Sequence, residues 1–295
     1  MIIIIVVRMK TKVSLDDFFL ALAVADLTVN ITVTLDNYIL YTSALQASTS
    51  TKHHTCRIIT YLIIASERSS KFILAALSVQ RGIAVAFPHK IQLFCHQKNT
   101  RWTILIVICA AVISSSHTLY FFGYDERIHQ CTILGNSFYI INVFSLERGC
   151  INCLTILLVL ISNAEMMYHI QKATEHQTSS REMASTEQRR RNKFNSVTVA
   201  AISVSVSYVV FLLPKTIVFA FYRYGIEAED SQDDSRVLII EGTKKLREFA
   251  MVLLVNVLSK ANYCLNFYIY ALPGRRYRRE IAKLCRDIFQ ATKSV

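Results

Sequence analysis

The sequence contains little glycine and proline. Only 7 Gly and 3 Pro occur among its 295 residues. These residues are common in turns, so their scarcity disfavours a turn-rich β protein and favours long helices. Internal repeats and low-complexity segments are absent as well. The sequence therefore predicts a small number of long helices.

The sequence also lacks the groupings that enzymes and zinc proteins need. No nucleophile–base constellation is evident, and the CxxC spacing of "CINC" at 150–153 lies in an apolar stretch without partner ligands. An inverted repeat with broken helices, which would favour a transporter, is missing too. We therefore expect neither an enzyme nor a transporter.

Apolar residues are abundant, and they gather in long runs. Of all residues, 53% are hydrophobic, and a spanning helix needs about 20 of them in succession. The opening "MIIIIVV" at 1–7 is too short to span, and we interpret it as the inner end of a first helix whose beginning is missing; a short loose tail is the alternative. Six stretches are long enough: 15–41, 55–86, 102–122, 146–171, 196–222 and 249–272.

The basic residues define an orientation. Alternate connections (8–17, 87–101, 171–196 and 273–295) hold 19 Lys and Arg, against 5 in the other three connections. Because positive loops stay in the cytoplasm, the C-terminus is expected inside and the N-terminus outside. The net charge of +12 reflects this bias, so we expect no nucleic-acid partner. The predicted fold is an all-α seven-transmembrane bundle, one domain over 1–295.

Two of the eight cysteines face the oxidising side. Cys56 lies at the outer mouth of one predicted helix, and Cys131 lies in the following outer loop. A disulfide between them would persist there; two free thiols are the alternative.

Ionisable residues at membrane depth form two groups. Asp26 is the only charge in the central part of its predicted span, at 18–35, and Ser70, Asn262 and Asn266 could supply neutral oxygens beside it. Such a set suits a small ion pocket for sodium, or an internal hydrogen-bond network without an ion. The second group is expected to form its own ion pairs, with either a structural or a ligand-binding role: Glu67, Arg68, Lys71 and Lys215.

Several motifs together resemble the rhodopsin-like (class A) G-protein-coupled receptors. "LAVAD" at 22–26 resembles their second-helix signature, and "RGIAVAFPHK" at 81–90 resembles their second inner loop, with Cys56 and Arg81 at the family spacing. Pro214 matches the sixth-helix proline. "NFYIY" at 266–270 resembles the "NFxxY" variant of invertebrate neuropeptide receptors, of which the FMRFamide type is one.

The resemblance implies a mechanism and roles for residues. An extracellular ligand would favour an active state in which the sixth helix swings outward about its proline and admits a heterotrimeric G protein at the plasma membrane. Asp26, with its neutral neighbours, would be the sodium pocket of the inactive state. The residues implied in coupling or activation are Arg81, Tyr270, Pro214 and Pro88.

The chain departs from the family pattern at the inner end of its third helix. Gln80 stands where an acid normally precedes Arg81, Gly82 replaces the following tyrosine, and Leu212 replaces the sixth-helix tryptophan. These departures predict a weaker inactive lock and raised basal signalling, or a receptor that signals poorly.

The ligand is expected to be a peptide. Ile63 occupies the place of the aspartate with which amine receptors bind their ligand. Acidic residues at 227–234 suit a basic or amidated peptide, although they could also be solvated loop acids. The ligand-contact candidates are Glu67, Lys215, Asn256 and Tyr222.

Lys260 supports a competing hypothesis. It lies six residues before Asn266, the spacing at which opsins carry their retinal-binding lysine, and Glu67 or Glu147 could be the counterion. The rest of the opsin pattern is missing, so we do not expect retinal as a cofactor.

The basic segment after Pro273 resembles the family's short eighth helix. At 274–288, apolar residues recur at helical spacing opposite a basic face, which predicts an amphipathic helix on the inner leaflet. Membrane lipid is therefore an expected partner, and Cys285 on the apolar face is a candidate for palmitoylation.

Overall fold

The computed structural model describes residues 14–46, 49–87, 96–125, 130–134, 145–178, 202–218, 250–266 and residue 286. Some predicted features lie outside the described residues: 1–7, Pro88, Tyr222, the acidic 227–234, Tyr270, Cys285 and all of 274–288 except Arg286. The statements that follow concern the described residues.

Most of these residues are helical. The long helices are α2 (Ser14–Gln46), α3 (Thr49–Ala86), α5 (Gln97–Ser115) and α7 (Ser145–Thr178), with a short α6 (Thr118–Phe121). Two further helices cover Ile202–Val218 and 250–266. A hairpin of β1 (Phe122–Asp125) and β2 (Gln130–Ile133) follows α6, with Tyr124 opposite Cys131.

The predicted span at 102–122 differs from its expected form. It begins at Gln97 rather than 102, and it breaks at Ser116 and His117 into α5 and α6. Hydroxyl groups explain the break, because Ser115 and Ser116 donate hydrogen bonds to backbone carbonyls one turn back, at 2.7 and 2.8 Å. Such bonds compete with the regular helical pattern.

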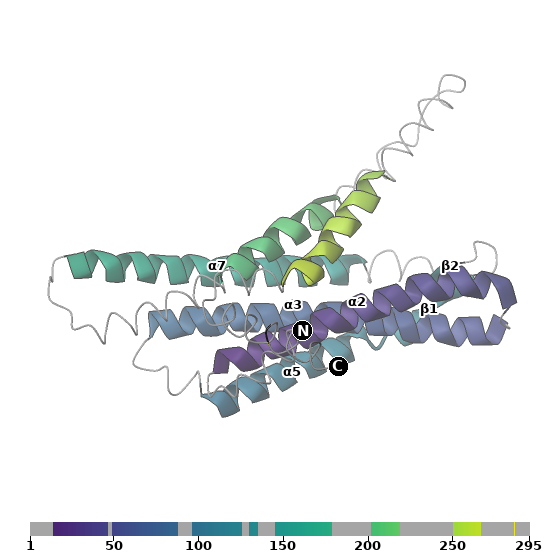
Figure 1. Ribbon diagram of the computed structural model, residues 1–295, viewed down its shortest axis with the longest axis horizontal. Coiled ribbons are helices and arrows are strands. Elements are labelled where there is room, and N and C mark those ends of the chain that lie inside the picture. The colour runs from purple at the N-terminus through teal and green to yellow at the C-terminus, as the bar shows by residue number, and fades with distance from the viewer. Residues whose placement is uncertain are drawn as a thin grey trace, which may run out of the picture.

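α3 is the central helix of the bundle. It contacts α2, α5, α6 and α7, and its outer end contacts both strands of the hairpin. Figure 1 shows α2, α3, α5 and α7 running along the long axis, with the helices 202–218 and 250–266 inclined to them. The residues of α3 therefore meet side chains from most of the other helices.

The interior and the outer faces of the bundle are both apolar. A core of aliphatic and aromatic side chains joins α2, α3, α7 and the helix 202–218, and includes Phe18, Leu22, Leu74, Val159 and Tyr208. Large apolar side chains such as Ile113 and Leu154 remain exposed on α5 and α7. Apolar surface of this extent suits contact with lipid rather than water.

Three of the described helices could cross a membrane by length and composition alone: Asp17–Asp36, Gln97–Phe121 (α5 with α6) and Leu146–His169. α3 has 38 residues and is long enough, but Glu67, Arg68 and Lys71 lie in its middle. These three residues are buried in the bundle. These three charged residues in the middle of α3 therefore face protein.

The hairpin is fastened to the outer end of α3. Cys56 and Cys131 form a disulfide across 75 residues, with their Cα atoms 5.7 Å apart, which confirms the predicted pairing. Arg57 Nε donates to the carbonyl of Phe122 at 2.9 Å, and the Tyr124 amide donates to His53 Nδ1 at 3.2 Å. The disulfide and these bonds hold the hairpin above the bundle.

Candidate ligand and ion sites

A cluster of charged side chains from four helices lies around the middle of α3. Its carboxylate, Glu67, comes from α3, and its cations come from α3, α7 and the helices 202–218 and 250–266. The Glu67 cluster comprises Glu67, Lys71, Arg148, Asn152, Lys215 and Lys260.

Glu67 is the acidic centre of this cluster. Lys260 Nζ lies 2.8 Å from Glu67 Oε1, and Arg148 Nη2 lies 3.7 Å from Glu67 Oε2. Lys71 and Lys215 are attracted to the same carboxylate from further away. Lys71 Nζ instead donates a hydrogen bond to the neutral Asn152 Oδ1 at 2.8 Å. The Glu67 carboxylate therefore attracts four cations.

The pairing differs from the sequence expectation. We expected pairs among Glu67, Arg68, Lys71 and Lys215, but the close partners of Glu67 come from α7 and the helix 250–266. Glu67 and Lys71 are four residues apart on one helix, yet both side chains point to partners on other helices. The packing of the helices against one another decides which side chains pair, and the spacing of residues along one helix does not reveal those pairs.

Arg68 belongs to a separate pair beside the cluster. Its Nη1 lies 2.8 Å from Glu147 Oε1 and donates to the Ser114 carbonyl at 2.6 Å. His117 Nε2 lies 3.3 Å from the other oxygen of Glu147. Arg68 therefore joins α3 to α5 and α7, and Glu147 is committed to this pair rather than to the Glu67 cluster.

The Glu67 cluster is partly accessible. The side chain of Glu67 is 6% exposed, whereas those of Arg148 and Lys260 are 34% and 33% exposed. Asn256 is half-buried and lies one turn from Lys260 on the same helix. A molecule that enters from outside could therefore reach the cations before the carboxylate.

The second polar cluster lies around Asp26 and is fully buried. Ser70 Oγ donates to Asp26 Oδ1 at 2.6 Å, and Asn266 Nδ2 donates to Asp26 Oδ2 at 2.8 Å. Asn262 is also buried, one helical turn before Asn266 on the same helix. The Asp26 pocket comprises Asp26, Ser70, Asn262 and Asn266, the four residues that the sequence analysis grouped.

The Asp26 pocket has the chemistry of a cation site. Among the described residues, no basic side chain lies within 4 Å of the Asp26 carboxylate, so its hydrogen-bond donors are neutral. The buried Oδ1 atoms of Asn262 and Asn266 have no hydrogen-bond partner in the described part of the chain. A hard cation takes oxygen ligands of these kinds, so the residues fit sodium.

The inner end of α3 shows how the chain accommodates its departures from the family pattern. Gln80 Nε2 donates to Thr100 Oγ1 of α5 at 2.8 Å, and Thr100 is fully buried. A Cβ on Gly82 would lie 3.4 Å from the Ser162 carbonyl oxygen of α7. Gln80 thus bonds to α5 where the family has an acid, and Gly82 permits close packing against α7.

Three further residues of the family pattern lie on α3 and on the helix 202–218. Arg81 is half-buried near the inner end of α3, and Pro214 is half-buried in the helix 202–218. Leu212, two residues before that proline, packs in the core.

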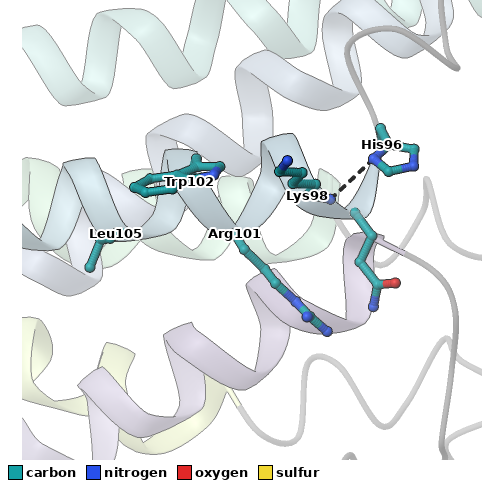
Figure 2. A pocket seen from close by; sticks show the side chains of 6 residues that line it. His96, Lys98, Arg101, Trp102 and Leu105 are labelled. Atoms are coloured by element: carbon teal, nitrogen blue, oxygen red, sulfur yellow. Dashed lines mark hydrogen bonds between the residues drawn. The ribbon is translucent and has the colours of Figure 1, made fainter.

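A surface pocket lies at the inner end of α5 (Figure 2). Arg101 points toward α2, where its Nε lies 3.1 Å from Asp17 Oδ2. The pocket is lined by exposed basic and apolar side chains with an interfacial tryptophan: Lys98, Arg101, Trp102 and Leu105, beside His96 and Gln97. Such residues are typical of the lipid headgroup level rather than of a ligand site in the bundle.

Sequence reasoning missed two members of the Glu67 cluster. Arg148 and Asn152 lie one turn apart in "LERGCIN", on an otherwise apolar helix. Polar residues at membrane depth usually face the bundle interior, and that rule could have placed both residues beside α3.

The long apolar helices, with their charged side chains turned toward protein, are typical of a polytopic membrane protein. A family model, the 7 transmembrane receptor (rhodopsin family), matches residues 1–270. The chain therefore belongs to this family of seven-helix membrane receptors, which signal through heterotrimeric G proteins. A comparison with curated proteins gives no significant match.

Proposed function

We propose that this receptor is activated by an extracellular peptide, as the resemblance to neuropeptide receptors of the FMRFamide type suggests. The Glu67 cluster carries the proposal, because it gathers charged groups from four helices below the outer hairpin. A peptide offers several charged and polar groups at once and can engage such a site. Ile63, by contrast, gives an amine ligand no carboxylate at its position.

Ligand binding would act on the inner end of the bundle through the helices that carry the Glu67 cluster. Lys215 follows Pro214 directly. A ligand that contacts Lys215 would therefore act on this helix close to its proline, where a backbone hydrogen bond is missing and the helix can bend. Tyr208 on the same helix hydrogen-bonds Thr155 of α7, with 2.9 Å between the hydroxyl oxygens. We propose that the ligand redistributes these contacts and favours outward movement of the inner end, where Arg81 would contact the G protein and Tyr270 would support Arg81.

We propose that sodium in the Asp26 pocket stabilises the inactive state. The support is the unbalanced carboxylate of Asp26 and the two buried amide oxygens without partners. A cation that binds only one conformation shifts the equilibrium toward it by its differential affinity. The cation and an activating ligand would then oppose each other.

The test is a G-protein activation screen. Cells that express the receptor are exposed to a library of neuropeptides, and G-protein activation is recorded against mock-transfected cells. Activation by a peptide, lost in Glu67→Gln when the response is normalised to the amount of receptor at the cell surface, is the expected result. A response only to small amines would contradict the proposal.

An opsin-like photoreceptor is the second candidate function. The observation that favours it is the 2.8 Å contact between Lys260 Nζ and Glu67 Oε1, because a protonated Schiff base on Lys260 would need such a counterion. Purified receptor incubated with retinal tests this candidate. A visible absorption band that is absent in Lys260→Arg would favour it over the peptide receptor, and its absence would remove it.

A further inference from the structure

The surface pocket at the inner end of α5 has a polar part and an apolar part (Figure 2). His96, Lys98 and Arg101 line it near the beginning of the helix, and Trp102 and Leu105 line it further along. Its volume is about 370 Å³, which is within the range of small-molecule sites. The pocket is therefore large enough for the headgroup of a lipid.

The polar part of the pocket presents hydrogen-bond donors and positive charge. The Nδ1 atom of His96 accepts from the Lys98 amide at 3.3 Å, so a neutral imidazole carries its proton on Nε2 and can donate from there. Lys98 is exposed and forms no ion pair with any described residue. Arg101 pairs with Asp17 through Nε, yet its side chain is 68% exposed. These three side chains suit a negatively charged group.

The apolar part of the pocket continues into an exposed face of α5. Trp102, Leu105 and Ile106 are spaced by three or four residues, so they lie on one side of the helix, and all three are exposed. Ile113 extends this face two turns further and is exposed as well. The face belongs to Gln97–Phe121, which is long and apolar enough to cross a membrane. An acyl chain can lie along it directly beside the polar part.

Contacts with two other helices hold the beginning of α5 in place. Thr100 is fully buried and accepts a hydrogen bond from Gln80 Nε2 of α3 at 2.8 Å. Arg101 points toward α2, where its Nε lies 3.1 Å from Asp17 Oδ2 (Figure 2). The pocket therefore occupies a fixed position beside α2 and α3, although its own side chains face outward.

We propose that this pocket binds a phospholipid whose headgroup carries a net negative charge. The headgroup contacts Lys98, Arg101 and His96 Nε2, and an acyl chain lies along the face of α5 from Trp102 to Ile113. The distribution of Lys and Arg predicts that this end of α5 faces the cytoplasm, where anionic lipids are concentrated. The lipid site is independent of the ligand that activates the receptor, and it is separate from the basic segment 274–288.

The fluorescence of Trp102 tests the proposal, because Trp102 is the one tryptophan of the sequence. The receptor is reconstituted in phosphatidylcholine vesicles with a minor fraction of brominated phosphatidylserine or brominated phosphatidylcholine, whose bromine atoms quench tryptophan on contact. The concentration dependence of the quenching gives the relative association constants of the two lipids. We expect phosphatidylserine to bind about 5-fold more tightly, the contribution of one basic residue near the membrane surface. Equal association constants would overturn the proposal.

Charge variants show whether the preference for phosphatidylserine belongs to the pocket. Lys98→Gln should lower the preference about 5-fold, whereas Lys98→Arg should keep it. Asp17→Asn releases Arg101 from its ion pair and should raise the preference. The control Lys172→Gln, which removes an exposed lysine of α7, should leave it unchanged. An equal loss in Lys98→Gln and Lys172→Gln would mean that the general surface charge attracts the lipid, and would overturn the proposal.

A soluble headgroup distinguishes a lipid site from a site for a free anion. Glycerophosphoserine carries the charges of phosphatidylserine without its acyl chains, and it is added to the vesicles at constant ionic strength. We expect the quenching by brominated phosphatidylserine to stay unchanged, because only the intact lipid also contacts the apolar face of α5. Displacement of the brominated lipid by an equal total concentration of glycerophosphoserine would show a site for a soluble anion and overturn the proposal.

Discussion

The Glu67 cluster and the Asp26 pocket are two polar regions of one apolar bundle, and their carboxylates have different surroundings. Glu67 faces four cations of the protein, whereas Asp26 is held by the neutral donors Ser70 and Asn266. Among the described residues, the Glu67 cluster therefore supplies its own cations and the Asp26 pocket does not. The comparison shows that the surroundings of each carboxylate differ in a way that the net charge of +12 does not reveal.

The largest effect is expected from removal of the one carboxylate of the Glu67 cluster. Glu67→Gln leaves the buried cations without their acid and should destabilise the receptor by about 3–5 kcal/mol, seen as a lower Tm and reduced surface expression. Glu165→Gln, an exposed acid of α7, is the control. Exchange of the two charges in Glu67→Lys with Lys260→Glu should recover part of the loss, and independent effects of the two changes would contradict the pairing.

Loss of the disulfide should affect the Glu67 cluster but leave the Asp26 pocket unchanged. Cys56→Ser releases the hairpin above the Glu67 cluster and should cost about 2–5 kcal/mol of stability, as for other native disulfides. Ligand response should fall, whereas the sodium effect at the buried Asp26 pocket should persist. Cys109→Ser, which removes a free cysteine of α5, is the control. A sodium effect lost together with the ligand response would show that the regions are not independent.

The Asp26 pocket should govern the response to sodium. Replacing N-methylglucamine chloride with sodium chloride is expected to lower basal nucleotide exchange on the G protein by about 5-fold, the lower end of common allosteric couplings. Asp26→Asn should remove this sodium dependence, because the amide carries no charge for the ion. Lys71→Met should keep it, and equal sodium sensitivity in all three proteins would argue against the pocket.

A smaller effect is expected at the inner end of α3. The bond from Gln80 to Thr100 is worth about 1 kcal/mol, and Gln80→Ala should raise basal signalling by up to about 5-fold if the bond favours the inactive state. Thr100→Val should have the same effect, and the double variant should add nothing further. Thr103→Val, on an exposed position of α5, serves as the control. Additive effects of the two single variants would show that the pair does not act as a unit.

The helices and one of the two clusters could be predicted from the sequence. Runs of apolar residues and the distribution of Lys and Arg predict spans, and Asp26 stands out because it is the only charge in the span Asp17–Asp36 apart from its ends. Its neighbours Asn262 and Asn266 were grouped with it on the family resemblance and on polar chemistry. The structure brings Ser70 and Asn266 to the two oxygens of Asp26.

The partners within the Glu67 cluster could not be predicted in the same way. Lys71, Lys215, Lys260 and Arg148 are all cations at membrane depth, and the sequence gives no reason for Glu67 to contact Lys260 most closely. That choice depends on how α3, α7 and the helix 250–266 pack together. The break between α5 and α6 likewise depends on local hydroxyl bonds that an apolar run conceals.

The sodium dependence of the melting temperature tests the difference between the two regions most directly. The Tm is measured for the wild-type receptor, Asp26→Asn and Lys71→Met, each in sodium chloride and in N-methylglucamine chloride. We expect sodium to raise the Tm of the wild-type receptor and of Lys71→Met but not of Asp26→Asn. A sodium effect that survives in Asp26→Asn, or one that Lys71→Met abolishes, would contradict the account.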